Sequence, residues 1–348
     1  MKNILLAGGG TAGHVTPHLA LLLELEKNFD NIYYIGSGKE IERKLFEGTC
    51  VKIFNVNPPA FVRSLSPKNA LIPFKLYKSV KECEKIIDKI KPSVIFSKGG
   101  YCALPVCLAG FKAKIPVICH ESDLSIGLAN KLCISRSTAF LTTFENALKG
   151  DNCFYCGPIL RSEFKKMNKL YALRKLGITN GKPTILVTGG SQGSKIINQA
   201  LGANIEKILP NFNVIHLYGK KNKPVYKSIN GYFAYPFADM PTVMSASDIA
   251  ISRGGSNTLF ELVNANLPAL IVPLKKGSRG DQIKNAEYFK NRGAVMTLDE
   301  SLLKENFIKV VDELYKNRKD ISQNQKNLNL KNGREETLKF LLKYGKNA

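Results

Sequence analysis

A glycine-rich segment near the start of the chain ends in a histidine. Gly8, Gly10 and Gly13 follow a short apolar run, and His14 comes directly after them. Glycines ahead of a helix leave backbone N–H groups free to face an anion, and a histidine there suits general-base chemistry. A dinucleotide site also needs an acid at the end of the second strand, where none occurs before Glu40. The segment predicts an anion site with His14 as its base, although a helix-capping histidine fits the same residues.

A second glycine turn, Gly189–Lys195, also follows an apolar run. It resembles a phosphate-binding P-loop, but Ser194 stands where the second glycine belongs and Ile196 where the hydroxyl residue belongs. This departure argues against an ordinary NTPase. Small residues at the start of a helix still suit a diphosphate, and the alternative is a tight turn without a ligand.

A third segment, Ser252–Glu261, again leads from a predicted strand into a helix. Glu261 lies one turn inside that helix. A buried carboxylate there could accept hydrogen bonds from both hydroxyls of a ribose. A capping residue followed by an ordinary helix-face glutamate explains the same pattern.

Two more polar segments, Gly99–Tyr101 and His120–Asp123, each come after a predicted strand. The carboxyl ends of parallel strands are where α/β folds bind ligands. No two aspartates are two residues apart, so we expect no Asp-x-Asp metal clamp. With a sugar-diphosphate substrate, helix ends and basic residues would stabilise the leaving group instead, and Arg161 and Lys195 are candidates.

Strands alternate with helices in both halves of the chain, which places these segments. Asn3–Ala7 is a predicted strand and Val15–Lys27 a predicted helix, and a second alternation begins with the strand Thr184–Thr188. The pattern predicts two doubly wound parallel sheets with right-handed crossovers, hence two Rossmann-like domains facing a cleft and joined near residues 157–165. Glu335–Tyr344 is predicted to be a further helix that packs across one of the domains.

Composition agrees with two globular domains in 348 residues. Lys and Arg number 51 against 28 Asp and Glu, a net charge of +23 that indicates an anionic partner or a lysine-rich codon usage. The lysines are spread along the chain without a nucleic-acid-binding motif, so we expect no nucleic acid partner. No uncharged stretch is long enough to span a bilayer.

Eight cysteines all precede residue 157, and several stand in apolar strings, as reduced buried thiols do. They predict a reducing compartment. Cys153 and Cys156 form a C-x-x-C pair, but a structural zinc site needs a second ligand pair, so we expect no metal.

An apolar stretch flanked by lysines, Leu71–Tyr77, fits a peripheral site on an anionic bilayer. A core-facing helix with a solvated lysine face is the alternative. The residues expected to contact a membrane are Leu71, Ile72, Phe74, Lys75, Leu76 and Lys78.

Six motifs occur in a familiar order along nearly the whole chain. They are Gly9–Pro17, Lys98–Tyr101, His120-Glu121 with Gly127–Asn130, Gly189–Gly193, Arg253–Thr258 with Glu261, and Gln282 with Asn285-Ala286. Together they resemble the MurG-type peptidoglycan N-acetylglucosaminyltransferase family.

The resemblance implies a GT-B fold with an acceptor domain at residues 1–160, a UDP-GlcNAc domain at 161–330 and a C-terminal helix at 331–348. It implies inverting transfer of GlcNAc from UDP-GlcNAc to the MurNAc 4-hydroxyl of lipid I, which gives lipid II. No cofactor and no obligatory metal are implied. The implied place is the cytoplasmic face of the cell membrane, on its anionic surface, with other cell-wall synthesis proteins as partners.

The family's functional positions carry over onto matching residues of this chain. His14 matches the base for the acceptor hydroxyl, Arg161 and Ser191 match nucleotide and phosphate contacts, Phe237 matches a backbone contact to uracil, and Gln282 matches a sugar contact. The remaining donor-site positions are Thr11, Ala12, Gly13, Asp123, Ser256, Asn257, Thr258, Leu259, Phe260 and Glu261.

Three residues depart from the family pattern. Asp123 stands where some members carry Asn, and a carboxylate accepts hydrogen bonds but does not donate them. Ala12 replaces a common glycine, and Asp281 replaces a second glutamine. The alternative function is another GT-B transferase that glycosylates a lipid such as diacylglycerol, and a UDP-sugar epimerase on the same fold is a further alternative.

Overall fold

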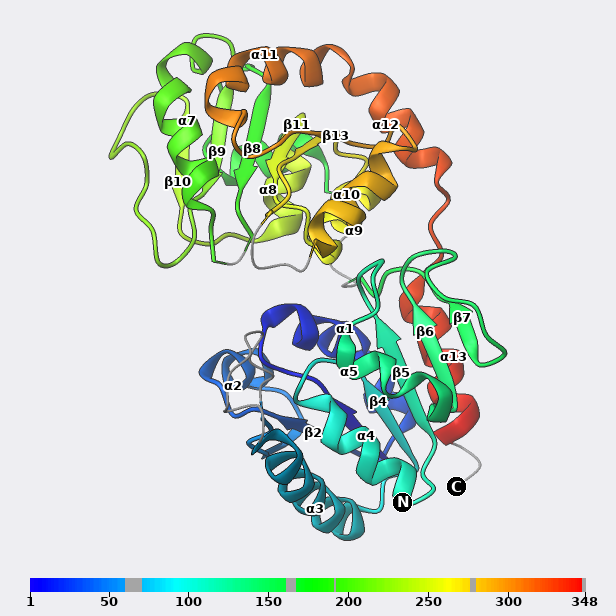
Figure 1. Ribbon diagram of the computed structural model, residues 1–348. Helices are drawn as coiled ribbons and strands as arrows, with labels where there is room; N and C mark the ends of the chain where they lie inside the picture. The colour runs from blue at the N-terminus through cyan, green and yellow to red at the C-terminus, as the bar shows by residue number, and fades with distance from the viewer. Residues whose placement is uncertain (60–70, 161–166, 191, 276–279, 346–348) are drawn as a thin grey trace. The chain divides into compact units, whose positions relative to one another are not determined.

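The computed structural model describes residues 1–59, 71–160, 167–190, 192–275 and 280–345 (Figure 1). The chain forms two compact units, one of residues 1–161 with 331–348 and the other of residues 162–330. The C-terminal segment therefore belongs to the first unit. No helix within the described residues combines the length and the apolar character needed to cross a membrane.

The first unit contains a parallel sheet of seven strands in the order β3-β2-β1-β4-β5-β6-β7. Its elements are β1 (Asn3–Ala7), α1 (Ala12–Asn28), β2 (Asn31–Gly36), α2 (Glu40–Phe46), β3 (Lys52–Asn55), α3 (Ile72–Ile90), β4 (Val94–Ser97), α4 (Ala103–Lys112), β5 (Val117–Glu121), α5 (Leu128–Lys131), η2 (Ile134–Arg136), β6 (Ala139–Thr142), β7 (Cys153–Tyr155) and α13 (Gly333–Gly345). The strand order reverses between β1 and β4. Such a reversal leaves a crevice at the carboxyl ends of the two strands, where α/β folds bind ligands.

Side chains of successive strand residues point to opposite faces of this sheet, and helices cover both faces. Leu5 and Ile95 face the apolar cluster that includes α3 and α4. Ile4 and Phe96 face the cluster that includes α1 and α13. Both faces are thus buried, which explains the continuous apolar runs in the sequence.

The return of the chain from residue 330 to the first unit depends on two glycines. A Cβ at Gly157 would lie 2.5 Å from the carbonyl oxygen of Lys331, and one at Gly333 would meet the backbone of Gly157 and Pro158. Beyond this close approach, Leu341 is fully buried against the first sheet. Figure 1 shows α13, in red, beside the strands of the first unit.

The second unit repeats the design with six parallel strands in the order β10-β9-β8-β11-β12-β13. Its elements are α6 (Lys169–Lys175), β8 (Thr184–Thr188), α7 (Lys195–Ile208), β9 (Asn213–Leu217), β10 (Tyr232–Tyr235), α8 (Met240–Ala246), β11 (Ile249–Ser252), α9 (Ser256–Asn264), β12 (Ala269–Ile271), α10 (Asp281–Lys290), β13 (Met296–Thr297), α11 (Leu303–Lys316) and α12 (Arg318–Asn327). The order reverses between β8 and β11. A second ligand crevice is therefore expected at the carboxyl ends of these two strands.

The predicted alternation is observed, with two differences that matter below. The strand predicted to end at Cys119 continues through His120 and Glu121, so these polar residues lie inside β5 and are buried. No sequence pattern predicts β6 and β7, because these strands are only four and three residues long.

Candidate functional site

The first glycine turn lies at the reversal point of the first sheet. Gly9 and Gly10 have φ angles of 134° and 85°, which side-chain-bearing residues rarely adopt. The turn leads into α1, whose first residue is Ala12 and whose N-cap is Thr11. Backbone N–H groups at the start of a helix have no partner within the helix, so this end can receive an anionic group.

His14 lies in the first turn of α1, partly exposed, rather than ahead of the helix. Its Nδ1 is 3.0 Å from the Thr11 hydroxyl oxygen. A Cβ at Gly100 would lie 3.4 Å from the imidazole, so the ring packs against the turn after β4. The ring also makes a hydrogen bond to the Gly9 backbone, and the ring nitrogen without a proton carries the lone pair that acts as a base. Burial, with the nearby Lys98 charge, lowers the pKa of His14 to about 4, so the ring is a neutral base at pH 7.

Glu42 on α2 fixes the shape of this turn, a role that no sequence pattern predicts. Its side chain is fully buried. Its carboxylate accepts hydrogen bonds from Gly10 N–H at 2.8 Å, from the Ser37 hydroxyl at 2.6 Å and from Gly38 N–H at 3.1 Å. The carboxylate thus ties the turn after β1 to the turn after β2. A lone glutamate in a charged helix gives no sequence signal of such burial.

Lys98, at the carboxyl end of β4, belongs to a motif that the sequence offered without a role for this residue. Only 3% of it is exposed, its ammonium contacts His120 Nδ1, and it donates to the Ser122 hydroxyl at 2.8 Å. Burial lowers its pKa to about 7. Its charge also lowers the pKa values of His14 and His120, so Lys98 helps to keep both rings neutral.

Glu121 organises the loop that carries Asp123. Its carboxylate accepts hydrogen bonds from Ser122 N–H at 2.9 Å, Asp123 N–H at 3.2 Å, Gly127 N–H at 2.9 Å and Asn130 Nδ2 at 2.9 Å. Asp123 is partly buried in this loop at the carboxyl end of β5. Because Lys98 donates to the Ser122 hydroxyl, this loop lies beside the turn that follows β4.

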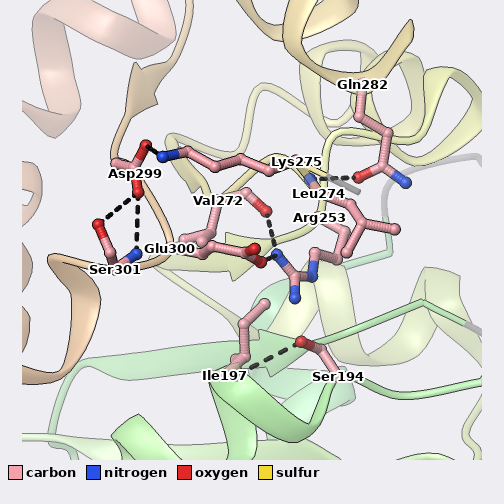
Figure 2. Close-up of polar contacts among 10 residues, drawn as sticks. All are labelled: Ser194, Ile197, Arg253, Val272, Leu274, Lys275, Gln282, Asp299, Glu300 and Ser301. Atoms are coloured by element: carbon pink, nitrogen blue, oxygen red, sulfur yellow. Dashed lines mark hydrogen bonds and ion pairs between the residues drawn. The ribbon is translucent and has the colours of Figure 1, made fainter. Parts of the chain in front are cut away.

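The second glycine turn lies at the reversal point of the second sheet. Ser194 caps α7, its hydroxyl accepting from Ile197 N–H at 3.4 Å (Figure 2). Gly190 and Gly193 have φ angles of 79° and 73°, and a Cβ at Gly193 would lie 2.7 Å from the Asn222 amide nitrogen. Lys195 is the exposed first residue of the helix. The turn therefore presents a helix N-terminus beside a cation, which suits a diphosphate.

The third segment supplies a second helix N-terminus at the same reversal point. β11 ends at Ser252, and α9 begins at Ser256, which together with Leu259 and Phe260 is buried. Asn257, Thr258 and Glu261 are partly exposed. We expected Glu261 to be buried, but it is only partly buried. The remaining exposure leaves its carboxylate accessible to a ligand.

Gln282, on the first turn of α10, lies against the same segment. Its side-chain oxygen accepts from Leu274 N–H at 3.0 Å, and a Cβ at Gly254 would lie 2.6 Å from its carbonyl oxygen (Figure 2). Arg253 is held by the Val272 carbonyl at 3.0 Å and by Glu300 at 2.9 Å. Arg253 thus holds the turn after β11 in place. The Gln282 side chain is fixed by its hydrogen bond from Leu274 N–H.

The other predicted positions lie in other segments of the chain. Phe237 follows β10, the edge strand of the second sheet, and is 62% exposed with the Lys220 ammonium over its ring. Arg161 and Ser191 lie outside the described residues. Thr11 and Gly13 are exposed at the start of α1 in the first unit.

The predicted membrane residues lie at the start of α3. Leu71, Phe74 and Tyr77 are 55%, 79% and 63% exposed and recur at three-residue spacing, so they share one face. Lys75 and Lys78 are exposed beside them, whereas Ile72 and Leu76 are partly buried. This face is exposed, whereas later turns of α3 bury Cys83, Ile87 and Ile90 in the core of the first unit.

Two family models match the chain. The glycosyltransferase family 28 N-terminal domain matches residues 4–142, and the glycosyltransferase family 28 C-terminal domain matches residues 184–339. These two matches cover the first sheet through β6 and the whole of the second sheet.

Curated relatives match over their full length. One from Clostridium botulinum (strain Kyoto / Type A2) is 42% identical, covering 99% of this chain and 100% of its own. One from Clostridium tetani (strain Massachusetts / E88) is 40% identical, covering 99% and 98%. Both are named UDP-N-acetylglucosamine--N-acetylmuramyl-(pentapeptide) pyrophosphoryl-undecaprenol N-acetylglucosamine transferase.

Solved structures show the fold. The crystal structure of Acinetobacter baumannii MurG superposes with a TM-score of 0.77 at 22% identity, covering 99% of this chain and 100% of its own. A UDP-GlcNAc 2-epimerase from Neisseria meningitidis, bound to UDP-GlcNAc, reaches 0.63 at 18% identity, covering 99% and 100%. The expected fold class, two Rossmann-like parallel-sheet units of the GT-B type, is confirmed.

Proposed function

Because the chain belongs to glycosyltransferase family 28, we propose that it transfers GlcNAc from UDP-GlcNAc to a lipid-linked acceptor. The acceptor is the MurNAc 4-hydroxyl of undecaprenyl-diphosphate-linked MurNAc-pentapeptide, and the product is lipid II. The names of the full-length relatives support these substrates. The observation that carries the proposal is that the two reversal points hold different chemistry: a neutral base in the first unit, and two helix N-termini beside a lysine in the second.

The first unit binds the acceptor. The neutral imidazole of His14 takes the proton of the 4-hydroxyl as that oxygen attacks the anomeric carbon of GlcNAc, with inversion. Thr11 and the Gly9 backbone hold the imidazole in place, and Glu42 holds the turn that leads to His14. A base placed in this way contributes about 10²–10⁴-fold to the rate.

The second unit binds the donor. The N-termini of α7 and α9 face the diphosphate, where negative charge grows as UDP leaves, and Lys195 adds a positive charge. Glu261 accepts from the ribose hydroxyls, and Gln282 contacts the sugar. With a leaving group stabilised by helix ends and a lysine, the reaction does not depend on a metal ion.

The face formed by Leu71, Phe74 and Tyr77 rests on the membrane. Aromatic and aliphatic side chains enter the interface, while Lys75 and Lys78 meet anionic head groups. The enzyme is then a peripheral protein of the cytoplasmic surface, where its lipid-linked acceptor lies.

Transfer of labelled GlcNAc from UDP-GlcNAc to a short-chain lipid I analogue tests the proposed function. EDTA is present, and diacylglycerol serves as a parallel acceptor. We expect a lipid II product that EDTA does not reduce. Sugar on diacylglycerol without lipid II product would move the function to the glycerolipid alternative, and loss of the product in EDTA would contradict the metal-independent mechanism.

A further inference from the structure

Three cysteine side chains converge in the core of the first unit. The sulfur atoms of Cys107 on α4, Cys119 on β5 and Cys133 just before η2 all lie within 4.8 Å of one another. Each residue is 1% exposed or less, and all three are free thiols. Within the part of the chain that the structure describes, no other three Cys, His, Asp or Glu residues bring their ligand atoms together in this way.

The three sulfurs differ from isolated buried thiols because all of them lie within 4.8 Å of one another. Three sulfurs this close together can share one bound ion, which an isolated thiol cannot do. Cys83, in the same apolar cluster, lies outside the group of three, and burial raises its pKa to about 12.

The surroundings restrict which ion fits. Three sulfurs select a soft ion. Zn²⁺ in a structural site takes four ligands, and three thiolates would leave it with a negative charge in an apolar core. Cu(I) with three thiolates would leave two negative charges there. A trivalent ion with three thiolates is neutral, which removes the cost of burying charge.

We propose that Cys107, Cys119 and Cys133 bind trivalent arsenic as a neutral three-sulfur complex. Arsenous acid, As(OH)₃, reacts with three thiols: three S–H and three As–O bonds break, three As–S bonds form, and three water molecules leave. The oxidation states of arsenic and sulfur do not change, so no other reactant is needed.

The cluster lies next to the candidate acceptor site but on the other face of the sheet. Cys119 directly precedes His120 in β5, and Ser97 directly precedes Lys98 after β4. Cys133 stands in the chain between α5, which has four residues, and η2, which has three, and its neighbour Leu132 is exposed. Local opening of such short elements requires much less free energy than global unfolding.

Titration of the reduced full-length chain with sodium arsenite tests the proposal. Ultraviolet absorption reports As–S bonds, and native mass spectrometry reports stoichiometry and the number of protons lost. We expect one arsenic per chain with loss of three protons, and a higher melting temperature. Cys119→Ala and Cys133→Ala should weaken binding at least roughly 100-fold, because even outer-shell changes at ion sites cost 10–100-fold.

Cys83→Ala is the matched control, because Cys83 is buried in the same cluster but lies outside the group of three. It should bind arsenic as the native chain does. Circular dichroism checks that each variant is folded, and the proton count on the native chain does not depend on any variant. Absence of bound arsenic, loss of fewer than three protons, or binding that survives Cys119→Ala would overturn the proposal.

Discussion

Removing the Glu42 carboxylate should loosen the turn that carries the catalytic base. The fully buried carboxylate accepts three hydrogen bonds, with Gly10 and Ser37 on one oxygen and Gly38 on the other. Glu42→Gln keeps one oxygen but places an amide N–H against the Gly38 N–H. Glu42→Gln thus weakens one charge-assisted hydrogen bond and leaves the Gly38 N–H without an acceptor, which should lower the free energy of unfolding by about 2–3 kcal/mol. Glu42→Ala should lower it roughly twice as much.

Urea unfolding and steady-state kinetics together measure this effect. We expect Glu42→Gln to lower kcat with the acceptor analogue, because Gly10 leads into Thr11 and His14, while the KM for UDP-GlcNAc stays unchanged. Glu47→Gln is the matched control, since Glu47 follows the same helix and is exposed. A Glu42→Gln chain with native stability and native kcat would refute the positioning role, and a change confined to the donor KM would place the effect in the wrong unit.

Three further predictions follow from burial and charge. All four histidines have pKa values below 6.5, because burial opposes their charged form, so the unfolded chain binds more protons below pH 6.5. The free energy of unfolding should therefore fall between pH 6.5 and 5, by up to about 1.4 kcal/mol per pH unit for each histidine, and a constant urea midpoint would contradict this. Lys98 is buried with a pKa of about 7, so above pH 7 the unfolded chain binds one more proton than the native chain. The free energy of unfolding should therefore rise by about 1 kcal/mol per pH unit between pH 7 and 9 relative to Lys98→Met, and parallel pH profiles of the two chains would exclude this. Phe74→Ser with Tyr77→Ser should reduce sedimentation with anionic vesicles, whereas Leu170→Ser, at a residue of similar exposure in the second unit, should not; equal losses would disprove the membrane face.

Much of the fold could be predicted from the sequence, because both sheets are buried on two faces and their strands are apolar runs that end in glycine turns. Asn3–Ala7 and Thr184–Thr188 were predicted with the observed bounds. The short strands β6 and β7 were not, since their pairing with β5 and with each other depends on neighbours in space rather than on a local pattern.

A site residue could be predicted from the sequence only where a chemically suitable residue stands next to a glycine turn. His14 and Ser194 stand beside glycine turns, so their positions follow from the chain itself. Glu42 and Lys98 act through contacts with residues that are distant in sequence, 32 positions away for Glu42 and Gly10. The three-cysteine cluster was missed for the same reason, because sequence spacing shows only pairs such as Cys153 and Cys156.

The division of labour between the two units is the central claim, and the kinetics of His14→Ala and Glu261→Ala in both substrates test it most directly. His14→Ala should lower kcat by about 10²–10⁴-fold with the KM for UDP-GlcNAc nearly unchanged. Glu261→Ala should raise the KM for UDP-GlcNAc with little change in the KM for the acceptor. Native turnover in His14→Ala, or native donor kinetics in Glu261→Ala, would contradict the account.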